Sequence, residues 1–539
     1  MKIVHNASIL GLAILTIMSA AAVDYQAEGR SWWAHIQYLA SDKLEGRDTG
    51  SAGHKLAAQY VAGEFERSGL KPAGASGYIQ PVKFDVSHID EPASSLDLIR
   101  DGKVQRLKLG EDAAFSLRSG IAPAFEGAAV FAGYGFAVPE HKYDELSGLD
   151  VKGKIVVYLS GGPKGIPGEL MSHYQSAGER WKHLHALGAV GTVVIANPKS
   201  MDVPWERAAL SRFMPSMSLA DPSSDPSADP SADEPAGAML SVRFNAANAD
   251  KLLAGSGHSI GEILAAAGSG QPLPKFPLMV RIRSKVSVKK SAAESQNVAG
   301  ILPGADPKLK DEYVVVSAHL DHIGVGKPIG GDSIYNGAMD DASGIASVIE
   351  IARHLQQSKT KLKRSILFLA VTGEEKGLQG SRYFATHPTV KAKSIVADIN
   401  IDMFLPLYPL KYLVVYGLEE STLGDQMKAV AAEAGVELQK DREPERNIFI
   451  RSDQYSFIRQ GVPSLFFKFG NLLGSPEEKM EKEWLRVRYH APSDDLSQPV
   501  DKAAAARFNE MIRELTVRAA NGSTKPAWKK ESFFRRFEK

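Results

Sequence analysis

Cysteine is absent from this chain of 539 residues. Its absence excludes disulfides, thiolate metal sites and a cysteine nucleophile. Any bound metal must therefore be held by histidine and carboxylate side chains, and this set of ligands suits catalytic zinc better than structural zinc.

An excess of either charge is also lacking, since 64 lysines and arginines balance 63 aspartates and glutamates to leave a net charge of +1. A near-neutral chain gives no electrostatic reason to expect a nucleic-acid partner. The 44% share of hydrophobic residues is ordinary for globular proteins. The length suggests roughly two to four domains.

Long apolar runs are absent after the N-terminus. Residues 9–18 form a short apolar run between Lys2 and the small residues 19–22, which is typical of a signal peptide. The run is shorter than the roughly 20 residues that span a bilayer, although a retained membrane anchor is the alternative interpretation. We expect residues 1–22 to be a signal peptide, and the mature protein to be periplasmic or extracellular with no integral membrane segment.

The remaining chain divides into regions of different pattern. Apolar residues at helical spacing predict helices near the start of residues 23–114, and short β-like runs with glycines predict a small β-rich domain over residues 115–290. Inside that domain, residues 220–236 are rich in Asp, Pro, Ser and Ala and predict a flexible loop. Residues 291–520 alternate strand and helix. Residues 521–539 form a basic tail that we expect to be loose or docked, and a membrane-surface patch is the alternative interpretation.

The strands predicted within residues 291–520 are near-continuous apolar runs, as in residues 313–316, 366–371 and 395–399. Such runs are typical of strands buried on both faces of a largely parallel sheet. The sequence therefore predicts an α/β fold. Open sheets of this kind form their sites at the carboxyl ends of the strands.

Histidines and carboxylates lie in five separate segments, several of them directly after a predicted strand. The candidates are His319, the pair Asp340 and Asp341, the pair Glu374 and Glu375, Asp402, and His490. Each is weak evidence alone, because a histidine after a strand is often a loop residue and an aspartate pair before a helix is often an N-cap. Grouped carboxylates repel one another, so bringing several together requires cations or protons.

Two zinc ions would supply that compensation. A two-metal site holds its ions roughly 3.5–4 Å apart, polarises a carbonyl and generates hydroxide near neutral pH. One carboxylate must bridge the metals, each metal needs a histidine and a further carboxylate, and another carboxylate must stay free as the general base. The candidates can be divided into two sets of three ligands that share Asp340, and this division leaves Glu374 as the base. The other members of the two sets are His319, Glu375, Asp402 and His490.

Five spaced motifs of the sequence resemble those of the two-zinc metallo-exopeptidases of clan MH, of the aminopeptidase Y and bacterial leucyl aminopeptidase type. The motifs are His319-Leu320-Asp321, Asp340-Asp341-Ala342-Ser343-Gly344, Gly373-Glu374-Glu375-Lys376-Gly377-Leu378, Asn400-Ile401-Asp402 and Tyr489-His490. The resemblance implies a three-layer α/β/α peptidase domain with a central mixed, largely parallel sheet. Residues 23–114 would be its N-terminal part, residues 291–520 its metal-binding core, and residues 115–290 resemble an inserted protease-associated domain.

The resemblance also implies how the metal ligands are divided. One zinc ion would be bound by His319 and Asp402, the other by Glu375 and His490, and Asp340 would bridge the two ions. The chain departs from the family pattern at Met339, where Asp is usual, and at Asp341, where Asn is usual. Asp340 keeps the usual spacing to the following Ser-Gly, and Asp341 remains the alternative bridge.

Further residues receive roles from the same resemblance. Glu374 would act as the general base, Asp321 would orient His319 as a neighbouring carboxylate often does, and Tyr489 would donate a hydrogen bond to the oxyanion. The Arg451-Ser452-Asp453 segment would approach the substrate. Asp453 would contact a free α-amino group of the substrate, or Arg451 would contact a carboxylate of the substrate. A salt bridge within the loop is the alternative.

The sequence thus predicts a zinc-dependent exopeptidase with two zinc ions, peptide substrates and a metal-bridging hydroxide as the nucleophile. Aminopeptidase action is the leading hypothesis. The alternatives are a carboxypeptidase or dipeptidase of the same family, a glutaminyl cyclase, and a receptor-like binding protein without catalysis. The inserted domain either roofs the cleft and restricts substrates or only packs against the catalytic domain.

Overall fold

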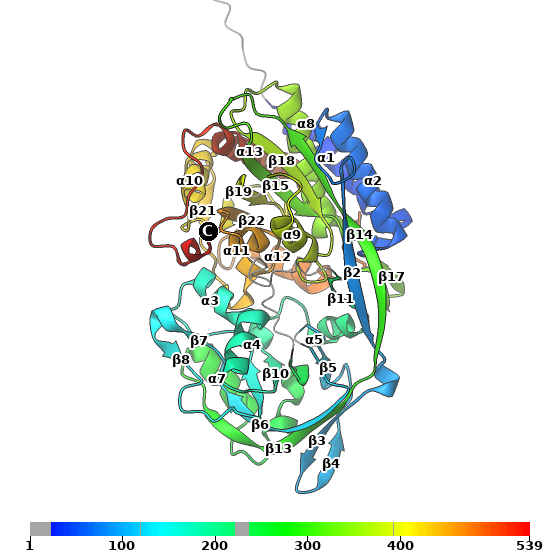
Figure 1. Ribbon diagram of the computed structural model, residues 1–539, viewed down its shortest axis with the longest axis vertical. Helices are drawn as coiled ribbons and strands as arrows, with labels where there is room; N and C mark the ends of the chain where they lie inside the picture. The colour runs from blue at the N-terminus through cyan, green and yellow to red at the C-terminus, as the bar shows by residue number, and fades with distance from the viewer. Residues whose placement is uncertain (1–22, 119, 221–236, 392, 539) are drawn as a thin grey trace, which may run out of the picture.

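The chain forms two lobes, each built around its own β-sheet (Figure 1). This computed structural model describes residues 23–118, 120–220, 237–391 and 393–538. The predicted signal peptide and almost all of the predicted loop at residues 220–236 therefore lie outside the described residues. Within those residues, no helix combines the length and the apolar character that crossing a bilayer requires.

The upper lobe in Figure 1 contains a ten-stranded mixed sheet with the order β11-β2-β14-β18-β15-β19-β22-β20-β21, and β1 pairs with β14. The central strands β18, β15, β19 and β22 are parallel, whereas β14, β2 and β20 join them in antiparallel fashion. The strands are β1 (Lys71–Pro72), β2 (Ile79–Ile89), β11 (Ser216–Leu219), β14 (Val288–Leu302), β15 (Tyr313–His319), β18 (Ser365–Val371), β19 (Ile395–Asn400), β20 (Tyr412–Tyr416), β21 (Glu437–Gln439) and β22 (Ser464–Gly470). The predicted mixed α/β sheet is confirmed, with its parallel part confined to the centre.

Helices cover both faces of this sheet because the central strands bury both sets of alternating side chains. Val314 and Val316 of β15 join the larger core on one face, and Val315 joins a smaller core on the other. The first face is covered by α1 (Tyr25–Leu39), α2 (Ala52–Arg67), α8 (Ser343–Gln357), α10 (Thr422–Ala434) and α13 (Lys502–Asn521), and the second by α9 (Gln379–Thr386) and α11 (Gln454–Arg459). This is the predicted three-layer arrangement.

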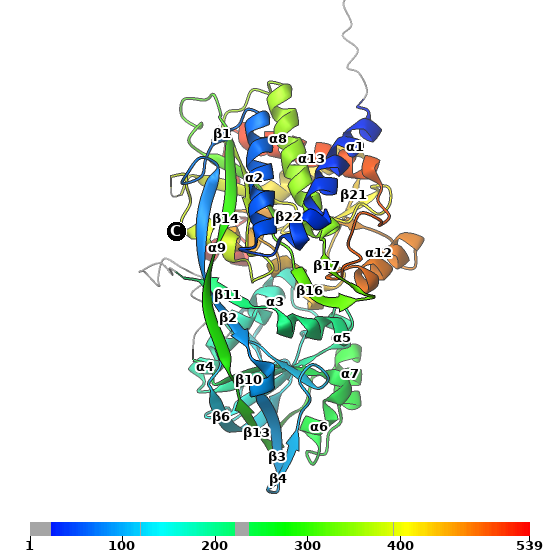
Figure 2. The same cartoon turned by 90° about the vertical axis from the view of Figure 1, so that its right-hand side faces the viewer.

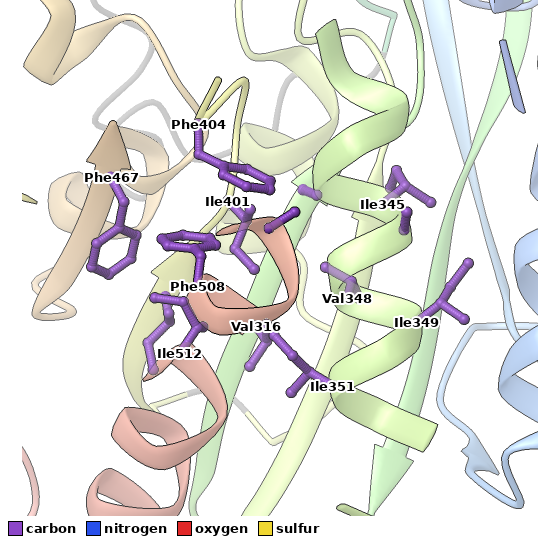
Figure 3. Close-up of a cluster of buried hydrophobic side chains, with 14 of the residues drawn as sticks. Val316, Ile345, Val348, Ile349, Ile351, Ile401, Phe404, Phe467, Phe508 and Ile512 are labelled. Carbon is purple, nitrogen blue, oxygen red and sulfur yellow. The ribbon is translucent and has the colours of Figure 1, made fainter. Parts of the chain in front are cut away.

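The core between α8, α13 and the sheet is close-packed and partly aromatic. Figure 3 shows Val348 of α8, Phe508 of α13 and Val316 of β15 among the side chains of this core. The rings of Phe404 and Phe508 are stacked with their centroids 4.4 Å apart. Such packing fixes α8, whose N-terminus carries part of the candidate site described below.

The lower lobe contains an eight-stranded sheet with the order β4-β3-β13-β6-β9-β10-β12-β5. The chain enters it from β2 and returns through β14, and these two long strands pair along the side of the molecule (Figures 1 and 2). The strands of this sheet are β3 (Ser95–Arg100), β4 (Lys103–Arg106), β5 (Ala113–Phe115), β6 (Ala124–Ala132), β9 (Ile155–Leu159), β10 (Gly191–Ala196), β12 (Leu240–Asn245) and β13 (Lys275–Lys285).

The lower sheet begins earlier in the chain than the predicted boundary at residue 115. Strands β3 and β4 already belong to it, because β3 pairs with β13 and β4 pairs with β3. All four residues of β4 are exposed, so no apolar run in the sequence indicates this strand.

The remaining elements of the two lobes are the short strand pairs β7 (Ala137–Val138) with β8 (Tyr143–Asp144) and β16 (Gly324–Ile329) with β17 (Asp332–Tyr335), and the helices α3 (Gly168–Gln175), α4 (Ala177–Ala186), α5 (Trp205–Ala208), α6 (Asp250–Leu253), α7 (Ile260–Ser269) and α12 (Pro476–Val487).

The C-terminal tail is docked, which was one of the two predicted outcomes. Trp528 and Phe534 are buried against the upper lobe in a cluster that includes Phe449. Phe533 lies against His173 of α3, with ring centroids 4.9 Å apart. The tail therefore contacts both lobes.

Candidate metal centre

The predicted metal ligands come from different elements that end at one edge of the central sheet. His319 is the last residue of β15, Glu375 follows β18, and Asp402 follows β19. Asp340 lies in the turn Ala338–Ala342 just before α8, and His490 follows α12. Parallel strands place their carboxyl ends side by side, so residues that are far apart in sequence meet there.

The five side chains form two groups that share Asp340. The Nε2 atom of His319 lies 3.2 Å from Oδ1 of Asp340 and 3.6 Å from Oδ1 of Asp402. The Nε2 atom of His490 lies 3.3 Å from Oδ2 of Asp340 and 3.4 Å from Oε1 of Glu375. Asp340 thus turns one carboxylate oxygen toward each histidine, as a bridging ligand would.

The charges of this cluster are compensated by its histidines. Burial alone would lower the pKa of His490, but Glu375 and Asp340 raise it to about 10. Burial alone would raise the pKa of Asp340, but the three surrounding histidines hold it well below its ordinary value. Protonated histidines here occupy the electrostatic place that cations would take among buried carboxylates.

Asp341, the alternative bridge, points to a different set of partners. Its Oδ1 atom accepts hydrogen bonds from the backbone N–H groups of Gly344 at 2.8 Å and Met403 at 3.1 Å. The carboxylate thus sits at the N-terminus of α8 in the manner of a helix cap. Burial raises the pKa of Asp341 well above its ordinary value. Its geometry is that of a structural residue beside the cluster.

Asp321 differs from its predicted role. The Nδ1 atom of His319 lies 3.0 Å from the main-chain carbonyl oxygen of Asp321, so the backbone and not the carboxylate orients this histidine. The carboxylate instead accepts the N–H groups of Glu374 at 3.1 Å and Glu375 at 3.3 Å, and the hydroxyl of Thr49 at 2.9 Å. The reason is geometric: the side chain turns toward the neighbouring loop after β18, which offers it free N–H donors.

Glu374 and Tyr489 both line a cavity of about 1270 Å³ that also contains the metal-ligand candidates. The carboxylate of Glu374 accepts no hydrogen bond from any described residue, and burial raises its pKa well above the ordinary value. The hydroxyl of Tyr489 accepts a hydrogen bond of 3.2 Å from Arg451, and its ring lies 4.0 Å from that of His490. Residues of both lobes line this cavity, so the lower lobe forms one of its walls.

Arg451 lines the cavity, whereas Asp453 does not, and the predicted substrate contacts of both residues stay predictions. The guanidinium of Arg451 forms an ion pair of 2.6 Å with Asp202 of the lower lobe. Its partner therefore lies in the other lobe, whereas the alternative prediction was a salt bridge within the loop of Arg451 itself. Asp453 is fully buried and does not line the cavity. It precedes α11 and faces the interior under the site, where burial raises its pKa to about 7.

Two further residues beside the metal-ligand candidates were missed by the sequence argument. His322 is fully buried, and its Nδ1 atom lies 2.9 Å from Oε1 of Glu375. Asp494 accepts the backbone N–H groups of Met339 at 2.9 Å and Asp340 at 3.0 Å, and it thereby holds the turn that carries the shared aspartate. His322 directly follows the motif His319-Leu320-Asp321, and Asp494 lies four residues after the motif Tyr489-His490, so proximity in sequence was the available signal.

Arg47 is a third missed residue and ties the N-terminal segment to this turn. Its fully buried guanidinium donates to the carbonyl oxygens of Leu39 at 2.5 Å, Leu320 at 2.9 Å, Asn336 at 2.7 Å and Gly337 at 3.0 Å. Burial lowers the pKa of Arg47 to about 10, while nearby aspartates oppose that change. The arginine thus adds positive charge next to the acidic cluster.

We expect Arg47→Met to lower the free energy of unfolding by about 3–5 kcal/mol, because it keeps the volume but leaves four buried carbonyl groups without a donor. Urea denaturation followed by circular dichroism would measure the change. The control is Arg67→Met, which removes an exposed arginine paired with Glu64 on α2 and should cost less than about 1 kcal/mol. Equal losses for the two variants would contradict this role of Arg47.

Asp202 joins the two lobes beside the cavity. Its carboxylate lies 2.6 Å from Nε of Arg446 and 2.6 Å from Nη1 of Arg451. Burial alone would raise the pKa of Asp202, but these two arginines lower it from 3.8 to about 2. Because the folded pKa is lower than the unfolded one, the stabilisation is complete above about pH 4 and is lost as the pH falls toward 2.

We therefore expect Asp202→Asn to lower the free energy of unfolding at pH 7 by about 1–3 kcal/mol, a range that allows for the partial exposure of Arg451. The difference from the parent protein should shrink as the pH is lowered from 4 to 2. Denaturation curves at pH 7 and pH 3 measure both effects. Asp150→Asn, which removes an exposed pair with Lys154, is the control and should change stability little at either pH. A difference that grows at low pH would contradict the assignment.

An α/β/α sheet whose strand ends carry two histidine–carboxylate groups around one shared aspartate defines a class of candidate two-metal hydrolases. Residues 297–516 match the family model described as peptidase family M28. This match agrees with the family predicted from the spaced motifs.

Curated relatives match parts of the chain. Aminopeptidase YwaD of Bacillus subtilis is 26% identical over 235 residues, which are 43% of this chain and 46% of that protein. Aminopeptidase NAALADL1 of Mus musculus is 32% identical over 139 residues, which are 25% of this chain and 17% of that protein. The chain thus spans less than half the length of these relatives.

One solved structure has the same fold over nearly the whole chain. An aminopeptidase from Aneurinibacillus sp. strain AM-1 superposes with a TM-score of 0.54 and 18% identity, covering 93% of this chain and 96% of that one. This likeness extends to both lobes and shows the shared fold alone.

Proposed function

We propose that this protein is a zinc-dependent aminopeptidase that removes residues from the N-terminus of peptides. The observation that carries the proposal is Asp340, whose two carboxylate oxygens face His319 and His490 in a cavity that also contains Glu374. The match to the model of peptidase family M28 and the aminopeptidase names of the relatives support the same activity.

The residues present suit two zinc ions. Histidine nitrogens and carboxylate oxygens are zinc ligands, and each of the two groups contains one histidine and one carboxylate besides the shared Asp340. The Oε1 atom of Glu375 is buried and faces only ring nitrogens among the described residues, His322 Nδ1 at 2.9 Å and His490 Nε2 at 3.4 Å, which are themselves possible zinc ligands. His319 and Asp402 would hold one ion, and Glu375 and His490 the other. His490 is preferred to His322 as a ligand because it lines the cavity, whereas His322 lies behind it.

The chain's own residues would perform the proton transfers. Zinc ions held there would polarise the scissile carbonyl and lower the pKa of the attacking water. Glu374 would accept a proton from that water and return it to the leaving amine, which suits a buried carboxylate with a raised pKa and no donor. Tyr489, which lies beside His490, would donate a hydrogen bond to the oxyanion.

Action at the N-terminus is supported by the names of the relatives, which include aminopeptidase YwaD and aminopeptidase NAALADL1. The charges of Asp340, Glu375 and Asp402 would be compensated by the two zinc ions, so these carboxylates do not by themselves select a free amine. The proposal places the free amine, and not the C-terminal carboxylate, next to the metal ligands.

We also propose that the protein is exported after removal of residues 1–22, on the basis of the signal-peptide pattern. N-terminal sequencing of the mature protein from its natural host tests this part of the proposal. An intact Met1 would contradict it, and a first residue near Val23 would support it.

The metal is the first thing to measure. We expect elemental analysis of the purified protein to find about two zinc ions per chain, as a site with one bridging carboxylate requires. We expect 1,10-phenanthroline to abolish hydrolysis of leucine p-nitroanilide, and added zinc to restore it. N-acetyl-leucine p-nitroanilide is the control substrate and should not be cleaved. No bound metal, or equal cleavage of the acetylated substrate, would overturn the proposed function.

A further inference from the structure

Three arginines of the lower lobe face the cavity without an ion-pair partner among the described residues. They are Arg118, Arg180 and Arg243, here called the arginine wall. The metal-ligand candidates line the same cavity from the upper lobe. The cavity is therefore acidic where the upper lobe carries the carboxylates and basic where the lower lobe carries these arginines.

Arg180 is the strongest sign that this wall is built for a ligand. Only 6% of the residue is exposed, yet its Nε and one Nη atom have no hydrogen-bond partner. Its guanidinium lies 4.3 Å from the ring centroid of Tyr158, which orients it but does not satisfy its N–H donors. Buried donors without acceptors are rare. The positive charge of this guanidinium has no ion-pair partner among the described residues, and an anion in the cavity would supply one.

Arg243 and Arg118 extend the wall from neighbouring elements. Arg243 lies on β12 opposite Ala114 of β5, and Arg118 follows β5 in the chain. Both side chains are exposed and line the same cavity, so their positive charges are open to a ligand there. A bound anion would supply the counter-charge that the described residues do not.

The wall borders the proposed catalytic loop. The Cζ and Nη2 atoms of Arg118 lie 3.7 Å from the position that a Cβ atom on Gly377 would occupy. Gly377 belongs to the same turn as Glu374 and Glu375, because its N–H donates to the carbonyl oxygen of Glu374 at 2.8 Å. A group bound at Arg118 would therefore lie beside the turn that carries Glu374 and Glu375.

We propose that the arginine wall binds a carboxylate of the peptide substrate, so that the enzyme favours short peptides that carry this group within reach of the site. The inference rests on the proposed aminopeptidase function and adds the substrate class. The carboxylate belongs either to the C-terminus of a short peptide or to an acidic side chain. Arginine suits both, because its guanidinium forms paired hydrogen bonds with a carboxylate.

The test compares substrates that differ only in this charge. With the zinc-loaded enzyme, kcat/KM is measured for Leu-Gly, Leu-Gly-Gly and Leu-Gly-Gly-Gly, for their C-terminal amides, and for Leu-Glu-Gly amide. For at least one of the three peptide lengths, we expect kcat/KM of the free acid to exceed that of its C-terminal amide by about tenfold or more, which corresponds to the loss of one charged hydrogen bond. A preference for Leu-Glu-Gly amide over Leu-Gly-Gly amide would instead identify an acidic side chain as the group.

The double variant Arg118→Gln/Arg243→Gln should lower this preference by about tenfold or more, with the loss in KM rather than in kcat. Arg180→Lys should reduce it less, because the charge stays while the paired hydrogen bonds are lost. The control is Arg281→Gln, which removes an arginine of the same lobe that is paired with Glu126 and does not line the cavity. This control should leave the preference unchanged.

Two results separate the inference from the proposed function. Cleavage of leucine p-nitroanilide with no preference for any carboxylate, in parent and double variant alike, would overturn the inference and leave the aminopeptidase proposal standing. If no substrate is cleaved, calorimetric binding of Leu-Gly-Gly and its amide to parent and double variant still tests the wall. Tighter binding of the acid to the parent alone would support it, and equal binding would overturn it.

Discussion

Replacement of Asp340 by asparagine is expected to lower kcat/KM by roughly 10³-fold or more and to reduce the zinc content of the protein. The variant keeps the size of the side chain but gives up the negative charge and one of the two oxygens that face His319 and His490. Metal ions contribute several kcal/mol to stabilising the transition state, which corresponds to about that factor in rate. Elemental analysis and hydrolysis of leucine p-nitroanilide measure the two effects.

The matched control is the neighbouring variant Asp341→Asn. An asparagine there can still accept the N–H groups of Gly344 and Met403 through its carbonyl oxygen. We expect zinc content and activity within about twofold of the parent, a difference of less than 1 kcal/mol. If Asp341→Asn lost both metals and Asp340→Asn lost none, Asp341 would be the bridge.

The second large effect is expected from Glu374→Gln. Glutamine cannot accept the proton of the attacking water, so we expect kcat to fall by about 10²- to 10⁴-fold, as for loss of a general base. Zinc content should be unchanged, because the carboxylate of Glu374 belongs to neither of the two metal-binding groups. Steady-state kinetics with leucine p-nitroanilide, together with elemental analysis of the same preparation, separate these two effects.

A conservative change elsewhere controls for the loss of a carboxylate in general. Glu483→Gln on α12 removes an exposed glutamate paired with Arg486, far from any role in the site. It should leave kcat and KM at the parental values. Loss of zinc from Glu374→Gln would instead show that Glu374 is a ligand, and full activity of that variant would assign the base to another residue.

Much of the fold was predictable because its signals are local. The apolar runs that became β15, β18 and β19 are buried on both faces, and a strand of that kind needs no partner to be recognised in a sequence. Strand β4 shows the opposite case. It is exposed along its whole length and belongs to the lower sheet only through its pairing with β3, so the predicted domain boundary fell too late.

The candidate site likewise contains residues that the sequence could identify and roles that it could not. His319, Glu375 and Asp402 could be singled out because each closely follows a strand, and the parallel topology brings such positions together. Whether Asp321 acts through its carboxylate or its carbonyl could not be read from the motif, since that depends on which donors the loop after β18 turns toward it. The roles of these residues remain predictions until the variants are measured.

The amino-acid composition already limited the chemistry available here: without cysteine, and with histidines and carboxylates after buried strands, any metal site must use nitrogen and oxygen ligands. The packing of distant segments was needed to show which of two adjacent aspartates turns toward both histidines, and which arginines lack an ion-pair partner among the described residues. Arg47 reaches carbonyl groups almost 300 residues away, and Arg451 is neutralised by Asp202 of the other lobe. The pattern that identifies a strand is a property of neighbouring residues, whereas the partners of long polar side chains depend on how distant segments pack.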